Sequence, residues 1–327
     1  MKSSDQKKII FLCGSIIMPW TKRDLQILQK YFEIAILHQA SPTFLKGSKW
    51  KAFRAFNYVM SRLIDFLRLF KEIRKADLTF DWFASEFAVT GILISKLLRK
   101  KSIVVVGGYD IENMPEINYG NMQYARQRHF TTFGLKNADI VLPFSEFAAE
   151  KVRKLTDNKA TIRAANLACD TERFKQKGQK EDIVITAGFI DKTYVPRKGF
   201  KTFVEAAKYL PEIKFYLIGK QRDEAINELK AIATPNVEFT GFLFDDDLLS
   251  MYQRAKVFCL LSYQEGEGGG GVLGEAMACG CVPVVSEKAV ALRETVGDCG
   301  FYVPYGDAKA TAEAIKKKKK KRRWKHQ

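Results

Sequence analysis

Two glutamates that are separated by seven residues, Glu267 and Glu275, offer the clearest chemistry in this sequence. Glycines fill much of the interval between them, and apolar runs lie before and after it, at residues 257–261 and 282–285. This order is typical of a strand, a glycine loop, a short helix and a second strand. A helix N-terminus behind such a loop presents backbone N–H groups and partial positive charge, which favour a phosphate.

Carboxylates beside a phosphate would be repelled by it, so we expect both glutamates to accept hydrogen bonds from hydroxyl groups on either side. A molecule that offers hydroxyls, a diphosphate and hydroxyls again is a nucleotide sugar. The alternative is a purely structural turn, because glycine-rich turns before helices are common. The donor-binding residues predicted in this loop are Gly268, Gly269, Gly270, Gly271, Val272 and Glu275, and Glu267 is predicted to face the sugar as a catalytic residue.

The spacing and its flanks resemble the E-x7-E element of family-four glycosyltransferases, and residues 182–307 as a whole are similar to that family. The resemblance implies an α/β protein with the GT-B fold, which has two tandem Rossmann-like doubly wound domains. It also implies retaining, metal-independent transfer of a hexose from a nucleoside-diphosphate sugar to an acceptor hydroxyl. No cofactor is expected, since the nucleotide sugar is a substrate. One departure is Gly269, where the family usually carries an aromatic or aliphatic residue; Glu265 also competes with Glu267 for the sugar-facing role.

Basic residues after the first strand of the second domain are the next candidates. Lys198, followed by Gly199, matches the family's Lys-Gly pair and would neutralise the diphosphate as a point charge. The family has an arginine directly after Gly188, but this chain has Phe189, so Arg197 is a candidate substitute. The alternative is that Arg197 and Lys198 are solvated loop charges. Strand ends at Gly188 and Gly219 are predicted to border the donor.

In the first domain, a strand predicted at residues 102–106 runs into a glycine turn before Tyr109 and Asp110. Such a turn at the carboxyl end of a parallel strand allows close approach of a ligand. The family often carries His-Asp here; Tyr109 replaces the histidine and Asp110 persists. We therefore predict Asp110 as the third catalytic residue, with Glu267 and Lys198.

Apolar runs alternate with helical patterns throughout, which predicts βαβ units and parallel sheets. We expect a first, acceptor-side domain at residues 1–168, a linker at 169–181, the donor domain at 182–315 and a polybasic tail at 316–327. The strands predicted are 8–13, 34–37, 78–82, 102–106, 140–143, 161–166, 182–188, 214–218 and 237–240. The helices predicted are 22–30, 50–75, 84–98, 123–136, 146–155, 200–209, 224–233 and 248–255.

No metal site is predicted. The chain has three scattered histidines, and its six cysteines are expected to be reduced thiols rather than disulfides or zinc ligands. The run Asp245, Asp246 and Asp247 superficially matches an Asp-x-Asp metal motif, but it stands where a helix begins, so helix capping explains it.

The net charge of +17 is concentrated at the end of the chain, where the last twelve residues carry nine positive charges. The remaining 45 basic and 37 acidic residues leave +8, which suits an anionic ligand or membrane surface and makes nucleic acid an unlikely partner. The family usually continues past the tail with a helix that returns to the first domain, so we expect the C-terminal end to be truncated. The alternative is a polybasic anchor for anionic lipids or nucleic acid.

The helix predicted at residues 50–75 combines basic residues with an apolar stripe at three- and four-residue spacing. A basic amphipathic helix can lie on a membrane, which would suit a lipid-linked acceptor; ordinary core packing explains the stripe equally well. The stripe consists of Phe53, Phe56, Met60, Leu63, Leu67 and Phe70.

No run reaches the eighteen apolar residues of a membrane span, and the apolar N-terminus is interpreted as a first strand rather than a signal peptide. We therefore expect a cytoplasmic protein, with the inner face of the cell membrane as a further possibility. Two rival functions stay open. These are a sugar-nucleotide epimerase of the same fold and a non-enzymatic protein that binds nucleic acid or membranes through its basic tail.

Overall fold

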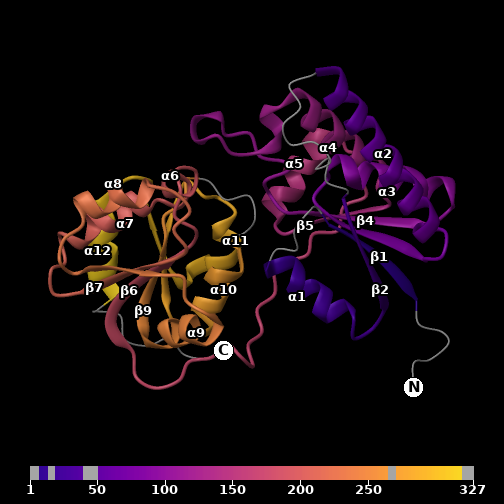
Figure 1. Cartoon of the computed structure of the whole chain (residues 1–327). Coiled ribbons are helices and arrows are strands. Elements are labelled where there is room, and N and C mark those ends of the chain that lie inside the picture. Colours follow the sequence, from indigo (N-terminus) through magenta and orange to yellow (C-terminus); the bar gives the residue numbers. More distant parts are fainter. Residues whose placement is uncertain (1–6, 14–18, 40–50, 264–269, 319–327) are drawn as a thin grey trace. The chain divides into compact units, whose positions relative to one another are not determined.

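The computed structural model describes residues 7–13, 19–39, 51–263 and 270–318, and all structural statements below concern these residues. Contacts divide the chain into two compact units. The first comprises Met1–Pro115 and Tyr119–Ala165, and the second comprises Glu116–Asn118 and Asn166–Gln327. Figure 1 shows the first unit in indigo to magenta and the second in orange to yellow. Each unit has its own parallel sheet, as the alternating pattern predicted.

The first unit is built on a five-stranded sheet with the order β2-β1-β3-β4-β5. All of its pairings are parallel, and β1 lies between β2 and β3. Runs of Ile, Val and Phe form these strands because branched and aromatic side chains fit a pleated, buried surface. The strands are β1 (Lys8–Cys13), β2 (Glu33–His38), β3 (Leu78–Trp82), β4 (Lys101–Val106) and β5 (Ile140–Pro143).

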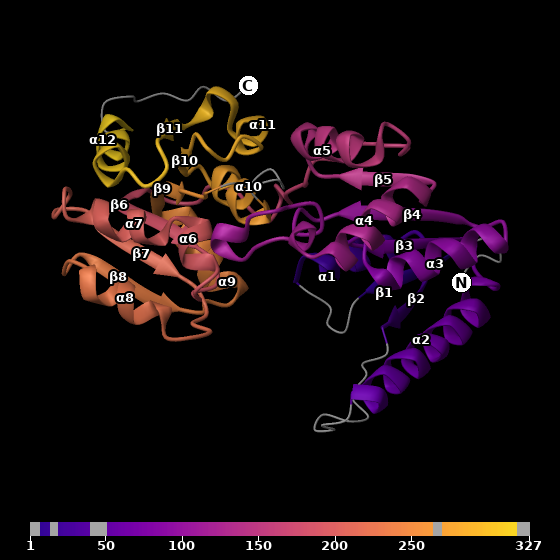
Figure 2. The same cartoon turned by 90° about the horizontal axis from the view of Figure 1, so that it is seen from above.

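Helices pack on both faces of this sheet. Two core clusters lie on one face, one beneath α2 and α3 and the other beneath α3, α4 and α5. On the other face, Leu25 of α1 packs with Phe11 and Trp82. Figure 2 shows α2 as a long helix along the outer edge of the unit. The helices are α1 (Pro19–Leu28), α2 (Lys51–Ile73), α3 (Glu86–Leu97), α4 (Ala125–Asn137) and α5 (Glu146–Thr156), with short 3-10 turns η2 (Pro115–Ile117) and η3 (Asn121–Gln123).

The second unit is built on a six-stranded sheet with the order β11-β10-β9-β6-β7-β8. The chain runs from β6 outward to β8, then returns to place β9 on the other side of β6. The strands are β6 (Glu181–Ala187), β7 (Lys214–Ile218), β8 (Val237–Gly241), β9 (Ala255–Leu260), β10 (Val282–Ser286) and β11 (Phe301–Val303).

The helices of the second unit are divided between the two faces of the sheet, which Figure 1 makes visible. One buried cluster joins the sheet to α7, α8 and α12, and the other joins it to α9, α10 and α11. The helices are α6 (Tyr194–Lys198), α7 (Phe200–Ala207), α8 (Ala225–Ile232), α9 (Asp245–Arg254), α10 (Gly270–Ala278), α11 (Leu292–Val296) and α12 (Ala308–Lys318), with a 3-10 turn η4 (Gly297–Cys299). No described helix is both long and apolar enough to cross a membrane.

The segment predicted as a linker is mostly exposed, and its Phe174 is buried in the core cluster beneath α9 and α10. Two sequence predictions need correction. The strand predicted at residues 161–166 forms only one bridge, Ile162 with Val141, although three backbone hydrogen bonds join the segment to β5. The acidic run that begins α9 does not cap it through a side chain; Phe244 is the N-cap, and the three aspartates occupy the first turn. There their charge suits the helix dipole.

Candidate active site

The strand order of the second sheet reverses between β6 and β9, and ligands of open α/β sheets bind at the carboxyl ends of strands at such a reversal. After β6 come Gly188 and the loop to α6, and after β9 comes the loop to α10. These are the segments that carry the donor residues predicted from the sequence. The fold therefore brings the two predicted halves of the donor site to one edge of one sheet.

Two of the predicted glycines touch each other at this edge. A Cβ atom on Gly219 would lie 1.7 Å from the carbonyl oxygen of Gly188, a distance that no side chain tolerates. The backbone N–H of Gly188 in turn donates to the carbonyl oxygen of Ile218 at 2.9 Å. Gly219 is thus required by the close approach of two strand ends. This gives the glycine a structural role beside its predicted place at the donor.

Lys198 lies between the ends of β6 and β9. Its Cγ is 3.9 Å from the position that a Cβ would take on Gly188. The next residue, Gly199, has a left-handed φ of 65°, and a Cβ there would lie 2.1 Å from the carbonyl oxygen of Leu261, just past β9. Because Gly199 packs so closely on that strand end, Lys198 is held near the start of the glycine loop.

Arg197 does not have the exposed position that the interpretation as a solvated loop charge required. It is 4% exposed, and its guanidinium carbon lies 5.2 Å from the centre of the Tyr194 ring. Its carbonyl oxygen accepts a hydrogen bond from the backbone N–H of Tyr263 at 2.8 Å. Arg197 therefore joins α6 to the end of β9, and the interpretation as a solvated loop charge is wrong for this residue.

The helix predicted after the glycine loop is α10, which begins at Gly270 and continues through Gly271, Val272 and Glu275. Glu275 is 8% exposed. Burial and, next, the Glu275 carboxyl hold the pKa of the Tyr252 hydroxyl well above its ordinary value of 10.0, which places the two groups together. Glu267, Gly268 and Gly269 lie outside the described residues.

Sequence analysis missed a cluster at the same edge. Lys288, which follows β10, has its ammonium group 3.5 Å from the centre of the Tyr263 ring. The rings of Tyr263 and Tyr305 meet edge to face with their centres 5.1 Å apart, and the Tyr305 hydroxyl donates to the carbonyl oxygen of Pro196 at 2.8 Å. The position of Tyr263 and Lys288 directly after strands was the signal that could have found them.

In the first unit, Asp110 has no exposed surface. Its Oδ2 accepts a hydrogen bond from the backbone N–H of Ala84 at 3.2 Å, which ties the turn after β4 to the loop after β3. Burial raises the pKa of Asp110 to about 6, against the lowering effect of backbone N–H groups. The hydrogen bond to Ala84 joins these two loops, and the catalytic role of Asp110 stays a prediction.

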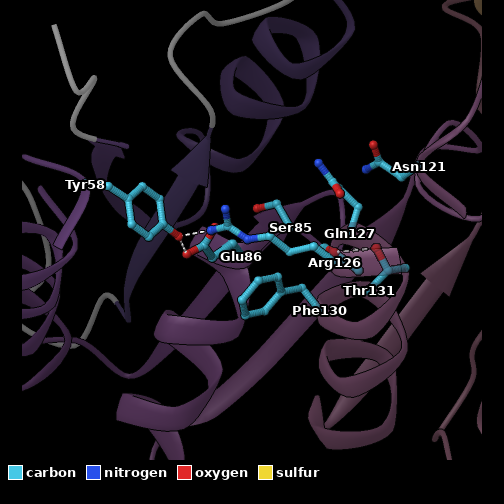
Figure 3. A pocket seen from close by; sticks show the side chains of 9 residues that line it. Tyr58, Ser85, Glu86, Asn121, Arg126, Gln127, Phe130 and Thr131 are labelled. Carbon is cyan, nitrogen blue, oxygen red and sulfur yellow. Dashed lines mark hydrogen bonds and ion pairs between the residues drawn. The ribbon is translucent and has the colours of Figure 1, made fainter. Parts of the chain in front are cut away.

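A pocket of about 180 Å³ opens where α3 and α4 begin, on the inner side of α2 (Figure 3). These helices run back along parallel strands, so their first turns lie at the carboxyl edge of the sheet. Thr131 donates to the carbonyl oxygen of Ala84 at 2.9 Å, which connects the pocket to the loop that Asp110 holds. The lining residues are Tyr58, Ala84, Ser85, Glu86, Asn121, Arg126, Gln127, Phe130 and Thr131.

Charge in this pocket is balanced. Arg126 pairs with the Glu86 carboxylate at 2.7 Å, and the Tyr58 hydroxyl contacts both groups (Figure 3). The Arg126 guanidinium also lies over the rings of Tyr58 and Phe130. Burial raises the pKa of Glu86, while Arg62 acts to lower it. The pocket thus presents amides, a hydroxyl and aromatic faces without a large excess of charge. None of these residues was predicted, because they come from three separate helices.

Within the described residues, no three His, Cys, Asp or Glu side chains form a group that could hold a metal ion. Five cysteines in this part of the chain are free thiols, Cys169, Cys259, Cys279, Cys281 and Cys299. Burial raises the pKa of Cys279 to about 11, so this thiol stays protonated at neutral pH.

Residues 181–318 match the family described as glycosyl transferases group 1. The matched segment starts at β6 and ends with α12, so it contains every element of the donor half. This segment is therefore similar to the group 1 glycosyltransferases. The resemblance inferred from the glutamates and their flanks is thereby confirmed.

Curated proteins that are similar to this chain occur in Escherichia coli. The protein WcaL of strain K12, named as a colanic acid biosynthesis glycosyltransferase, is 27% identical over 72% of this chain and 60% of its own. The O-antigen chain mannosyltransferase B is 28% identical over 55% of this chain and 51% of its own. The chain thus spans between half and two thirds of the length of these two relatives.

Solved structures place the whole chain in the GT-B fold. The Anabaena HepE protein, crystallised with UDP and glucose, aligns with a TM-score of 0.72 over 95% of this chain and 89% of its own, at 15% identity. Sucrose-phosphate synthase from Thermosynechococcus elongatus aligns with the same score and coverage at 17% identity. The predicted fold class is therefore confirmed across both units.

Proposed function

We propose that the chain is a retaining hexosyltransferase that moves a sugar from a nucleoside-diphosphate sugar to an acceptor hydroxyl, without a metal ion. One observation carries the proposal. The segment that matches the family places Lys198 and the N-terminus of α10 at the reversal point of one sheet. The HepE structure contains UDP and glucose, and the curated relatives include a mannosyltransferase, which supports a hexose donor.

Each donor-side group has a proposed task. The leaving diphosphate gains charge as its bond to the sugar breaks, and the Lys198 ammonium with the N–H groups of Gly271 and Val272 would stabilise that charge. Glu275 would accept hydrogen bonds from the ribose hydroxyls. Glu267 would contact the transferred sugar. This division assigns each half of the predicted motif to one end of the donor.

Nucleoside diphosphates test the donor site directly. A bound diphosphate should raise the unfolding temperature, and the increase should grow with the logarithm of its affinity. Glu275→Ala should weaken this binding by about 1.5–3 kcal/mol, the usual contribution of a hydrogen bond to a charged group. The matched control is Glu313→Ala on α12, where the side chain is exposed. Equal calorimetric affinities for the wild type and Glu275→Ala would remove Glu275 from the site.

Transfer assays separate the proposal from its alternatives. Transfer to the acceptor should continue in EDTA; loss in EDTA that manganese restores would contradict the metal-independent mechanism. Conversion of the donor sugar in the absence of any acceptor would instead identify the epimerase. Nuclear magnetic resonance of the product's anomeric proton reports whether the configuration is retained.

For the acceptor, we propose a sugar ring of a glycan or of a lipid-linked glycan, held in the pocket of the first unit. The amides of Asn121 and Gln127 suit hydroxyl groups, and the aromatic faces suit the apolar side of a sugar ring. The pairing of Arg126 with Glu86 argues against a strongly anionic acceptor, because the cation is already compensated.

Two single tyrosine variants, one of them a control, test the proposed acceptor pocket. Tyr58→Phe removes the hydroxyl that contacts both Glu86 and Arg126, so the pair should loosen and the acceptor KM should rise on the order of tenfold. Donor affinity should stay unchanged. The control Tyr124→Phe removes an exposed hydroxyl from a residue outside the lining of the pocket. An unchanged acceptor KM in Tyr58→Phe would place the acceptor elsewhere.

The inner, cytoplasmic face of the cell membrane is the proposed location, since a nucleotide-sugar donor and a lipid-linked acceptor meet there. The basic composition outside the tail supports an anionic membrane as a partner. The first three residues of the polybasic tail, 316–318, belong to α12, and the rest lie beyond the described residues, so its proposed role as an anchor stays a prediction.

A further inference from the structure

The long helix α2 turns two polar side chains inward and several apolar side chains outward. At four-residue intervals, Ser61, Asp65, Leu69 and Ile73 are buried against the first unit, so the inner side is polar at Ser61 and Asp65 and apolar at Leu69 and Ile73. Asp65 is 2% exposed and pairs with Arg62 at 3.1 Å. A soluble protein normally turns its apolar stripe inward.

The outward side of α2 is apolar. Val59 is 61% exposed, and Phe56 and Leu67 are each 59% exposed. Met60 and Leu63 are also exposed and complete a stripe at three- and four-residue spacing. The sequence interpretation that these side chains pack in the core is wrong for the four of them that it named, Phe56, Met60, Leu63 and Leu67. A contiguous apolar face of this kind marks an interaction surface.

Charge indicates what the surface binds. Lys71 and Arg74 are exposed and continue the apolar stripe at and just past the C-terminal end of α2. The two acidic residues of the helix do not oppose them, because Asp65 is buried and Glu72 contacts Lys75 at 3.4 Å. Apolar side chains beside exposed cations, with no exposed carboxylate on the same side, suit the surface of an anionic lipid bilayer.

We propose that the outward side of α2 docks the first unit on an anionic membrane, with the five apolar side chains inserted among the lipids and Lys71 and Arg74 at the headgroups. The same helix carries Tyr58, which lines the proposed acceptor pocket on its inner side. A lipid-linked acceptor would then reach the pocket along the helix that holds the membrane. This last step depends on the proposed function, whereas membrane docking does not.

Vesicle sedimentation of the full chain tests the docking. The protein should bind vesicles of phosphatidylcholine and phosphatidylglycerol better than phosphatidylcholine alone. The double variant Leu63→Gln with Leu67→Gln should bind the anionic vesicles at least about tenfold more weakly, because two leucines no longer transfer from water to lipid. The matched control, Ile27→Gln with Ile232→Gln, changes two exposed isoleucines on other helices and should bind normally.

The contribution of positive charge to vesicle binding is tested with a second double variant. Lys71→Gln with Arg74→Gln should reduce binding to anionic vesicles and leave the weak binding to phosphatidylcholine unchanged. Its control, Lys214→Gln with Lys230→Gln, removes two exposed lysines from the second unit. All variants should keep the wild-type unfolding temperature and its increase with nucleoside diphosphate, which separates loss of docking from loss of the donor site.

Two outcomes would overturn the proposal. If the leucine variant binds as the wild type does and all binding disappears in 1 M salt, where the Debye length is about 3 Å, then charge alone holds the protein to the membrane. If lipid-free protein is a dimer in sedimentation equilibrium and the leucine variant is a monomer, then a second copy of the chain covers α2 instead.

Discussion

The guanidinium carbon of Arg222 lies 3.3 Å from the centre of the Phe189 ring. Phe189 occupies the position after Gly188 where the family resemblance led us to expect an arginine. The backbone fixes the contact, since the N–H of Arg222 donates to the carbonyl oxygen of Ile190 at 2.9 Å. The segment that follows β7 therefore places the Arg222 guanidinium beside Phe189, where the family resemblance led us to expect an arginine.

We predict that Arg222 contributes to diphosphate binding. Arg222→Gln should weaken nucleoside-diphosphate binding about tenfold, since it removes a cation that can form charge-assisted hydrogen bonds with phosphate. Isothermal titration calorimetry measures the effect. The control Arg254→Gln removes a similarly exposed arginine that pairs with Glu181 at the opposite edge of the sheet. Equal affinities for the two variants would leave Arg222 with a structural role only.

Lys198 should matter more for turnover than for stability. Lys198→Gln should lower kcat by about 10²-fold or more, because a preorganised charge at the leaving group is lost. The unfolding temperature should change little, since Lys198 is only partly buried. Lys201→Gln, three residues further on and exposed, is the control. If both variants turn over at the same rate, the diphosphate is neutralised by another group.

Asp110 should make stability depend on pH. Its pKa of about 6 exceeds the ordinary 3.8, so the folded protein holds a proton that the unfolded chain releases between these values. Stability therefore falls as pH rises through this window, by up to about 3 kcal/mol.

The variant Asp110→Asn lacks this loss, because its amide oxygen can still accept from Ala84 without a charge. Urea unfolding of both proteins from pH 4 to 7 should show the wild type losing stability relative to the variant. Asp298→Asn, at an exposed position, should follow the wild type. Parallel curves for Asp110→Asn would mean that the carboxyl is ionised at low pH.

Replacement of Asn236 by aspartate should lower the stability of the second unit. Its amide nitrogen donates to the carbonyl oxygens of Ala207, Leu210 and Ile213 at 3.1, 3.0 and 2.8 Å. The side-chain oxygen accepts from Thr234 at 2.6 Å, which fixes the orientation of the amide. Asn236→Asp replaces the donor with a carboxylate oxygen and should lower the free energy of unfolding by about 1–3 kcal/mol in urea.

Asn227→Asp, exposed on α8, is the matching control and should cost much less. A shift of the urea midpoint that is equal in both variants would show that added negative charge, rather than the lost donor, is responsible.

Local patterns predicted most of the fold because each strand of these sheets is a short apolar run between helical segments. Residues 161–166 were predicted as a strand, but they form a single bridge, although three backbone hydrogen bonds join them to β5. The side of α2 that faces the core could not be predicted, because an apolar stripe is normally assigned to the interior. There, Ser61 and Asp65 are buried instead.

The proposed donor half of the site could be outlined from the sequence because its residues follow strands that are neighbours in one sheet, and parallel strands end at one edge. The acceptor pocket was not, since Tyr58, Glu86 and Arg126 come from three helices and meet only after folding. Arg222 was missed for a similar reason. Phe189 stands where the family has an arginine, so the sequence indicated that this positive charge was missing. The bridge between Ile190 and Gln221 places the Arg222 guanidinium over the Phe189 ring.

The contact between Gly188 and Gly219 limits how this protein can be diversified. A strand end that cannot accept even a methyl group at residue 219 leaves donor preference to the loops that begin on either side of it. A directed-evolution library that keeps both glycines and randomises residues 189–193 and 220–222 would explore new donors on an intact scaffold. In a library that also randomises the two glycines, most variants would carry a side chain that prevents the two strand ends from packing together.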